Sequence, residues 1–239
     1  MPVTITEFES IKESLSRSGY AKKNYTVRHG QKGYWKYRIS RPFLKARYSK
    51  FCKANPETPW LTPDAIIALN QLLKPDFVAL EYGSGRSTLF FSQKVEKLYS
   101  VEHHEEWYNH VKQLLAEKEV KNTSLNLIKP DKILSEIKLS SELQMFISEE
   151  DYPNKDNFFD KYVEYINSFD NDFFDFVLVD GRARKSCALV GVDKLKSGGL
   201  LVLDNSERLR YKAVHDTLKD WPRLFTTTGL TDTTIWLKP

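Results

Sequence analysis

The sequence predicts an α/β fold built around a doubly wound, mostly parallel β-sheet. Continuous apolar runs, such as residues 77–83, 173–181 and 198–205, are typical of strands that are buried on both faces. Segments whose apolar residues recur at helical spacing alternate with these runs. This alternation indicates parallel strands joined by crossover helices.

Composition favours one large domain with an extension or an insert. The chain has 239 residues, of which 41% are hydrophobic and 31 are aromatic. No apolar run approaches the ~20 residues needed to cross a bilayer, and the first ten residues lack the features of a secretory signal. Two cysteines, Cys52 and Cys187, are too few for a disulfide scaffold. We therefore expect a reduced, cytoplasmic protein.

Charge divides the chain into an N-terminal extension, residues 1–59, and a domain, residues 60–239. Residues 1–60 hold 13 Lys/Arg against 4 Asp/Glu, whereas the remainder holds 23 against 28. Residues 21–53 contain no acid and interleave 11 Lys/Arg with aromatic side chains. This basic arm could pack on the acidic body, pair with a second subunit as a homodimer, or bind nucleic acid, an acidic glycan or an anionic membrane surface.

The elements before residue 61 are the least regular. Residues 4–18 predict a short amphipathic helix, with Thr6 as its N-cap and Glu9 as the partner in a capping box. Residues 21–53 show no clean periodicity. The two prolines of "NPETPW", residues 55–60, indicate a boundary.

From Leu61 onward strands and helices alternate regularly. Thr62 is the expected N-cap of the first helix, and Pro63 occupies its first position. Residues 131–172 are too long for a simple crossover, so they predict the usual helix, at 158–169, plus an inserted cap. The other expected helices are 62–73, 86–95, 105–118, 186–196 and 213–221; the expected strands are 77–83, 97–103, 123–130, 173–181 and 198–205, and 224–238 form a hairpin.

A turn with two glycines, Gly83 and Gly85, follows the first strand. Ligands of doubly wound sheets bind at the carboxyl ends of the strands, near the point where strand order reverses. Glycines there let the backbone approach a ligand, and the next helix offers free N–H groups at its N-terminus. The turn could hold a dinucleotide, a phosphate or S-adenosylmethionine (SAM), or could be a tight turn without a ligand.

Three features distinguish between these ligands. Glu81, a buried acid before the glycines, would repel phosphate and attract an ammonium group. The dinucleotide fingerprint requires a third glycine where this chain has Thr88. Glu102, at the end of the second strand, can accept hydrogen bonds from both ribose hydroxyls. Together they describe a nucleoside with an amino-acid tail and no phosphate, which is SAM.

Four motifs resemble the class I SAM-dependent methyltransferases in order and spacing. They are "EYGSGRSTLFF" (81–91), "YSVEHHEEWY" (99–108), "FDFVLVDGRARKSCA" (174–188) and "SGGLLVLDN" (197–205). The resemblance covers about residues 60–239. It implies a seven-stranded Rossmann-like methyltransferase fold, a C-terminal antiparallel hairpin and an EC 2.1.1-type activity. The residues that it implies for SAM are Glu81, Gly83, Ser84, Gly85, Ser87, Thr88, Glu102, His103 and, at the adenine end, Asp131.

The candidate catalytic and metal-binding residues lie at the carboxyl ends of two expected strands, 173–181 and 198–205. Asp180, Asp204 and Asn205 resemble the Mg²⁺ site of catechol-type O-methyltransferases, although each aspartate could simply cap a turn. The catechol-type pattern has lysine where this chain has Ala183. The resemblance therefore leaves two versions open: Mg²⁺ or another divalent cation bound by these oxygens, or no metal, with Asp180 as the base and Arg182 binding an anionic or sugar-like acceptor.

The leading hypothesis is a SAM-dependent methyltransferase that acts on a small molecule or a saccharide, at oxygen. The alternatives are an RNA methyltransferase that uses the basic arm, a non-catalytic SAM-fold domain, and a nicotinamide-dependent oxidoreductase, which Glu81 and Thr88 disfavour. The tetrad typical of base-amine methylation is missing after residue 179, so an adenine N6 target is disfavoured. His103 and His104 could reach the pocket, although histidines at a strand end are more often surface or packing residues. Trp107 is expected to pack its helix against the sheet, with adenine contact as the alternative. The sequence does not identify the methyl acceptor.

Overall fold

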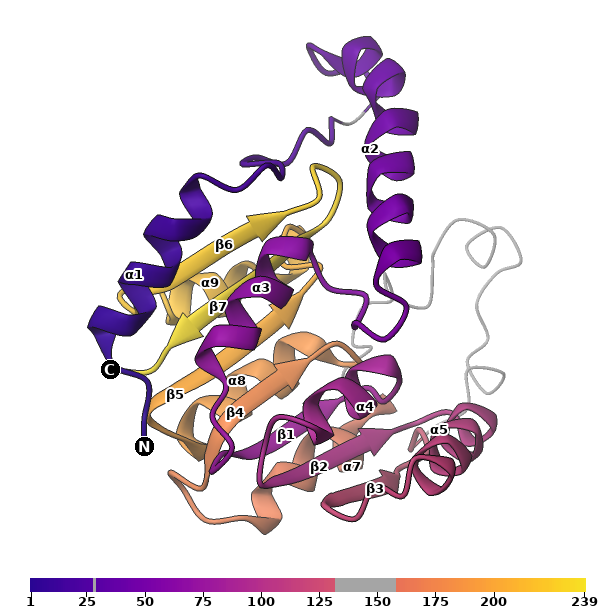
Figure 1. Cartoon of the computed structure of the whole chain (residues 1–239), viewed down its shortest axis with the longest axis vertical. Helices are drawn as coiled ribbons and strands as arrows, with labels where there is room; N and C mark the ends of the chain where they lie inside the picture. The colour runs from indigo at the N-terminus through magenta and orange to yellow at the C-terminus, as the bar shows by residue number, and fades with distance from the viewer. Residues whose placement is uncertain (28, 132–157) are drawn as a thin grey trace.

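The computed structural model describes residues 1–27, 29–131 and 158–239. A seven-stranded sheet with the order β3-β2-β1-β4-β5-β7-β6 forms its centre (Figure 1). Strands β1 to β5 are parallel, and β7 runs antiparallel to both β5 and β6. The predicted α/β fold and its C-terminal antiparallel hairpin are confirmed. The strands are β1 Val78–Tyr82, β2 Lys97–Glu102, β3 Thr123–Leu127, β4 Phe174–Val179, β5 Leu195–Asp204, β6 Arg223–Thr227 and β7 Asp232–Leu237.

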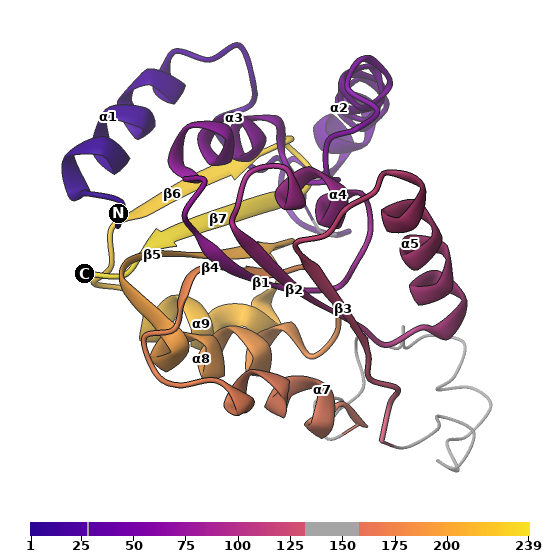
Figure 2. The same cartoon turned by 60° about the horizontal axis from the view of Figure 1, so that its bottom comes forward.

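Helices cover both faces of the sheet (Figure 2). Helices α1, α3 and α4 lie on one face, and α7, α8 and α9 lie on the other. Every residue of β4 is buried, which explains why this strand has the most continuous apolar pattern in the chain. The helices are α1 Ile5–Ser16, α2 Tyr34–Ala54, α3 Pro63–Leu72, α4 Arg86–Ser92, α5 Glu105–Glu117, α7 Asp160–Glu164, α8 Arg184–Lys194 and α9 Lys212–Thr217, with 3₁₀ turns at Tyr165–Ser168 and Leu209–Tyr211.

Helix α1 belongs to the hydrophobic core of the main domain. It is capped by Thr4, whose side chain accepts from the Glu7 amide while the Glu7 carboxylate accepts from the Thr4 amide. The capping box predicted at Thr6 therefore lies two residues too late. Phe8 is completely buried and lies in the same core cluster as the residues of α3. The predicted boundary at residue 59 therefore does not coincide with a boundary of the core.

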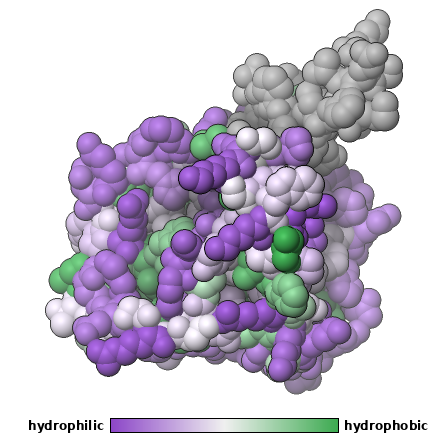
Figure 3. Space-filling view, turned by 90° about the horizontal axis from the view of Figure 1, so that it is seen from above, coloured by the Kyte–Doolittle hydropathy of each residue, from purple (hydrophilic) through white to green (hydrophobic). Residues whose placement is uncertain are grey.

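Helix α2 was not predicted, and it covers most of the basic arm. Its cations are spread around the helix and Pro42 lies inside it. Apolar side chains lie on its partly buried face, as at Tyr37 and Tyr48, and also on its exposed side, so neither face stands out in the sequence. Trp35, Ile39 and Phe43 are each at least 70% exposed. The helix projects from the sheet at the end where residues 34–43 lie (Figure 1). Seen from that end, the surface is mainly hydrophilic with separated apolar spots (Figure 3).

The connection from β3 to β4 supplies a buried helical segment. Tyr162 and Ile166 are completely buried against the sheet, and the Tyr82 hydroxyl donates to the Val163 carbonyl over 2.8 Å. This agrees with the helix expected at residues 158–169. The inserted cap was predicted for the remainder of 131–172, and residues 132–157 lie outside the described residues. Among the residues described, no helix is long and apolar enough to cross a membrane.

Candidate functional site

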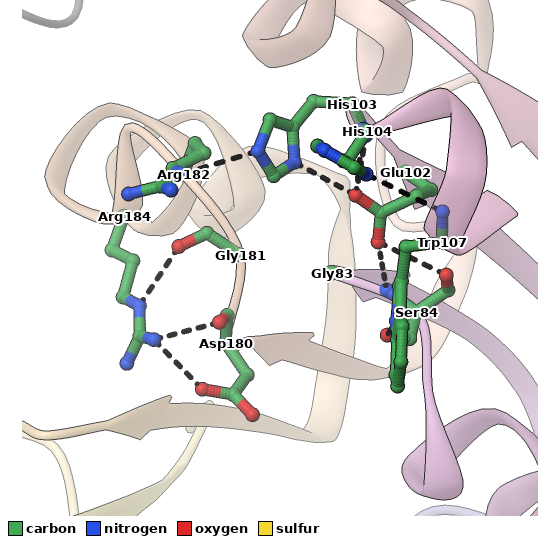
Figure 4. A pocket seen from close by; sticks show the side chains of 10 residues that line it. All are labelled: Gly83, Ser84, Glu102, His103, His104, Trp107, Asp180, Gly181, Arg182 and Arg184. Carbon is green, nitrogen blue, oxygen red and sulfur yellow. Dashed lines mark hydrogen bonds and ion pairs between the residues drawn. The ribbon is translucent and has the colours of Figure 1, made fainter.

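A cavity of about 420 Å³ opens at the carboxyl ends of β1, β2 and β4 (Figure 4). Strand order reverses between β1 and β4, and open α/β sheets bind their ligands at such a point. The volume falls in the range of small-molecule sites. The cavity is lined by Gly83, Ser84, Glu102, His103, His104, Trp107, Asp180, Gly181, Arg182 and Arg184.

The glycine turn after β1 packs against a second glycine turn after β4. Gly83 has a φ of +96°, a left-handed conformation that favours glycine, and a Cβ there would lie 2.7 Å from the Gly181 backbone. A Cβ on Gly181 would lie 2.8 Å from the Gly83 nitrogen and would overlap the Tyr162 hydroxyl. A Cβ on Gly85 would make only ordinary contacts, 3.7 Å from Trp107. The space at Gly83 therefore serves the contact between the two loops, and the approach of a ligand to its backbone stays a prediction.

Glu81 lies beneath the glycine turn and does not line the cavity. Its carboxylate is completely buried and accepts hydrogen bonds from the Thr88 hydroxyl at 2.6 Å and the Ser100 hydroxyl at 2.8 Å. Thr88 in turn accepts from the Gly85 amide at 2.9 Å. Burial raises the pKa of Glu81 to about 7, although the hydroxyls of Ser87, Thr88 and Ser100 oppose the rise. Glu81 thus holds the shape of the turn; the expected contact with an ammonium group has no support in this placement.

Glu102 reaches the cavity from the end of β2 as an ionised carboxylate. One oxygen accepts from the Ser84 amide and hydroxyl, and the other accepts from the amides of His103 and His104. Burial alone raises the pKa of Glu102, but the hydrogen bonds from His103 and His104 outweigh it and lower the pKa to about 2. This placement is the one expected of a ribose-binding acid.

His103 and Arg182 connect the two sides of the cavity (Figure 4). His103 Nδ1 lies 2.8 Å from the Glu102 carboxylate, and Arg182 Nε donates to His103 Nε2 over 3.2 Å. Arg182, predicted as an acceptor-binding residue, therefore lies at the edge of the cavity and contacts the β2 side.

Trp107 and His104 line the cavity, a placement that sequence reasoning gave only as the lesser alternative for each. The indole Nε1 of Trp107 donates to the Ser84 carbonyl over 2.7 Å, and the side chain is 39% exposed. Trp107 therefore covers the glycine turn and does not pack α5 onto the sheet as expected. His104 caps α5 by accepting from the Trp107 amide.

Asp180, Asp204 and Asn205 converge, as their positions at two neighbouring strand ends predicted. They converge on the Arg184 guanidinium, which lies 2.9 Å from an Asp180 carboxylate oxygen, 3.5 Å from one of Asp204 and 3.3 Å from the Asn205 amide oxygen. Burial and the neighbouring Asp204 carboxylate raise the pKa of Asp180 well above its usual range, although Arg184 opposes the rise. Asp180 lines the cavity and its side chain is 27% exposed, so it can reach a ligand.

The predicted divalent-metal site does not fit this arrangement. Each of the three side chains already contacts a cation, because the guanidinium lies among their oxygens. Within the part of the chain that the structure describes, no group of three or more His, Cys, Asp or Glu side chains could hold a metal ion. A hard divalent cation would require Arg184 to leave.

The other predicted residues lie away from the cavity. Asp131 accepts from the Lys161 amide at 3.0 Å, and its carboxylate lies 3.6 Å from the Lys161 ammonium. Ser87 is buried on α4. The predicted cofactor residues that do line the cavity are Gly83, Ser84, Glu102 and His103.

Tyr48 of α2 is a neighbour of the site that the sequence did not reveal. Its hydroxyl donates to the Leu61 carbonyl over 3.1 Å. Burial raises its pKa, and the thiol of Cys52 and the carboxylates of Asp204 and Asp180 add to the rise. The last turns of α2 therefore lie close to the strand ends that carry Asp180 and Asp204. Residues 21–53 show no clean periodicity, so the sequence did not indicate that Tyr48 lies near the site.

The sheet order and the antiparallel last strand are those of the Rossmann-like fold that the sequence predicted. No protein-family model and no curated protein matches this chain. Among solved structures, a putative caffeoyl-CoA O-methyltransferase from Staphylococcus aureus is 16% identical, with 86% of this chain and 98% of that chain covered and a TM-score of 0.49. A methyltransferase-like protein from Silicibacter pomeroyi is 22% identical, covers 68% and 79%, and has a TM-score of 0.47. A putative methyltransferase from Streptococcus mutans, in complex with SAH, is 14% identical, covers 71% and 93%, and has a TM-score of 0.46. At these identities the likeness concerns the fold.

Proposed function

We propose that the protein is a SAM-dependent methyltransferase that acts on an oxygen of a small-molecule or saccharide acceptor. One observation carries the proposal: a single cavity at the β1–β4 reversal is lined by Glu102 on one side and by Asp180 on the other. Glu102 suits the binding of a nucleoside's ribose, and Asp180 suits the removal of a proton from a hydroxyl.

Glu102 and the glycine turn would hold the cofactor. With a pKa of about 2, Glu102 stays ionised at neutral pH, and it would accept from both ribose hydroxyls by releasing two of its present donors, such as the Ser84 hydroxyl. Gly83 and Ser84 would face the methionine end, beside the Trp107 indole. SAM supplies an electrophilic methyl group when bound.

Asp180 would accept the proton of the acceptor hydroxyl. Its raised pKa brings it closer to neutrality, which favours a general base over a permanently ionised carboxylate. Arg182, with its guanidinium at the edge of the cavity, would bind an anionic or sugar-like acceptor. The acceptor would approach from the side of α2, where Tyr48 neighbours the Asp180 and Asp204 carboxylates.

Calorimetric titration with SAM, S-adenosylhomocysteine and NAD tests the cofactor. We expect the first two to bind and NAD not to bind. Binding of NAD alone would overturn the proposal in favour of an oxidoreductase, and binding of none would favour a non-catalytic domain.

An acceptor screen with Asp180→Asn tests the base. This variant should lose about 100-fold or more of the turnover while SAM affinity changes little. A fully active variant would exclude Asp180 as the base.

A second candidate is an RNA methyltransferase that uses α2 to hold its substrate. The exposure of Trp35 and Phe43 among the cations of α2 favours it, because such a surface can contact phosphates and stack bases. A gel-shift titration across salt concentrations tests it: retardation that weakens with salt supports RNA binding, and its absence excludes this candidate. The homodimer through residues 1–59 and the cytoplasmic location stay predictions.

A further inference from the structure

We propose that Arg184 takes the place of a divalent cation at the ends of β4 and β5, so that this strand-end site holds no metal. The inference concerns the same site as the proposed function but does not depend on it, because it is tested by metal binding. It accounts for two aspartates and an asparagine that converge as if around a metal and yet contact an arginine.

The guanidinium uses all of its nitrogens toward the two strand ends. Nη2 donates to the Asp180 carbonyl at 2.7 Å and lies 2.9 Å from that residue's carboxylate. Nη1 donates to the Asp204 carbonyl at 2.8 Å and to the Asn205 amide oxygen at 3.3 Å, and lies 3.5 Å from the Asp204 carboxylate. Nε donates to the Gly181 carbonyl at 3.0 Å. Six oxygens therefore face one planar cation that has no acceptor of its own.

The local backbone places Arg184 at this point. Ala183 has a φ of +44°, a left-handed conformation, and α8 begins at the next residue. Arg184 is therefore the first residue of α8, four residues after Asp180. The catechol-type pattern has a lysine at the position of Ala183, so the cationic side chain of this chain is one residue later.

Burial makes the guanidinium and a divalent cation mutually exclusive. The side chains of Arg184 and Asp204 are only 11% and 8% exposed. Removal of the guanidinium would leave the Asp180 and Asp204 carboxylates close together without the cation that they share. A divalent cation bound by these same oxygens would therefore displace the contacts that hold Arg184.

Titration with Mn²⁺, followed by electron paramagnetic resonance, tests the inference on the purified full-length protein. The wild type should show no saturable Mn²⁺ site. Arg184→Ala should acquire one, at least about tenfold tighter than any residual Mn²⁺ binding by the wild type, because the vacated oxygens of two carboxylates suit a hard cation. The Asn205 amide oxygen also accepts from Arg208 Nη2 at 2.9 Å and is not needed for the new site. Lys185→Ala is the matched control: it removes the adjacent, exposed cation of α8 and should gain no site.

Two results of these titrations would overturn the inference. One equivalent of Mn²⁺ bound by the wild type and lost in Asp204→Asn would overturn the inference, and so would a folded Arg184→Ala that binds no better than the wild type. If circular dichroism shows Arg184→Ala unfolded, the wild-type and Asp204→Asn titrations still decide the question. A protein that binds no Mn²⁺ and no SAM would support this inference while removing the proposed function.

Discussion

Replacement of Gly181 by alanine should destabilise the protein through steric overlap alone. The added Cβ would lie 2.8 Å from the Gly83 nitrogen and 3.0 Å from its Cα, and would overlap the Tyr162 hydroxyl. Tyr162 is completely buried, and its hydroxyl contacts the Val101 carbonyl over 3.3 Å, so the ring cannot move aside freely. The two loops must therefore separate to admit one methyl group.

The expected loss in the free energy of unfolding follows from the atoms that the added methyl group would displace. Overpacking of a well-packed interior by one methyl group costs about 1–3 kcal/mol, and overlap with both a backbone and a fixed ring places Gly181→Ala at roughly 2–4 kcal/mol. Tyr162→Phe removes the overlapping hydroxyl but not the Gly83 backbone. The double variant should therefore recover about 1 kcal/mol relative to the sum of the single variants.

Urea denaturation followed by tryptophan fluorescence measures the effect as a lower midpoint with an unchanged slope. Gly191→Ala is the matched control, because its Cβ would make ordinary contacts with Val177 at 3.5 Å and Leu201 at 3.7 Å inside α8. Alanine in a helix is favoured over glycine by about 0.5–1 kcal/mol, so this control should be stabilised. A midpoint for Gly181→Ala equal to or above that of Gly191→Ala would refute the reasoning.

Three further predictions follow from single contacts. In the folded protein the pKa of Glu81 is about 7, against an ordinary 4.5, so the folded state keeps a proton that the unfolded state releases. The free energy of unfolding measured with urea should therefore fall between pH 4.5 and 7 by on the order of 3 kcal/mol, and Glu81→Gln should remove that fall. Glu102→Gln should weaken SAM binding in calorimetry by about 10- to 100-fold, whereas Glu105→Gln, an exposed acid on α5, should not. Thr4→Ala should cost about 1 kcal/mol in thermal unfolding, and an equal loss in the exposed neighbour Thr6→Ala would contradict the observed cap.

The sheet could be predicted from the sequence because the residues of a strand themselves indicate whether it is buried. Val177 and Leu178 in β4 and Val202 in β5 are completely buried, and an unbroken apolar run indicates that state without knowledge of the neighbouring strands. The same reasoning placed Glu102 and Asp180 at strand ends that share one edge. Parallel strands bring their carboxyl ends together whatever lies between them in the chain.

The partners of the site residues could not be predicted in this way. Gly83 faces Gly181 because β1 pairs with β4, and strand order is not visible in either segment. Arg184 was overlooked because a cation in a helix gives no sign of the carboxylates that it will meet. Helix α2 was not predicted because only one of its faces is partly buried, so its sequence lacks the contrast between an apolar and a polar face on which periodicity depends.

The contact between the two glycine turns ties the cavity to the pairing of β1 with β4. Residues that meet across the cavity are distant along the chain: Arg182 and His103, for example, are 79 positions apart. Loss of the β1–β4 pairing would therefore separate the two sides of the site. A ligand that binds there stabilises only the native state, by about 2.7 kcal/mol at a hundred times its dissociation constant. The melting temperature in the presence of that ligand would therefore report on the assembly of the whole sheet, and not on one loop.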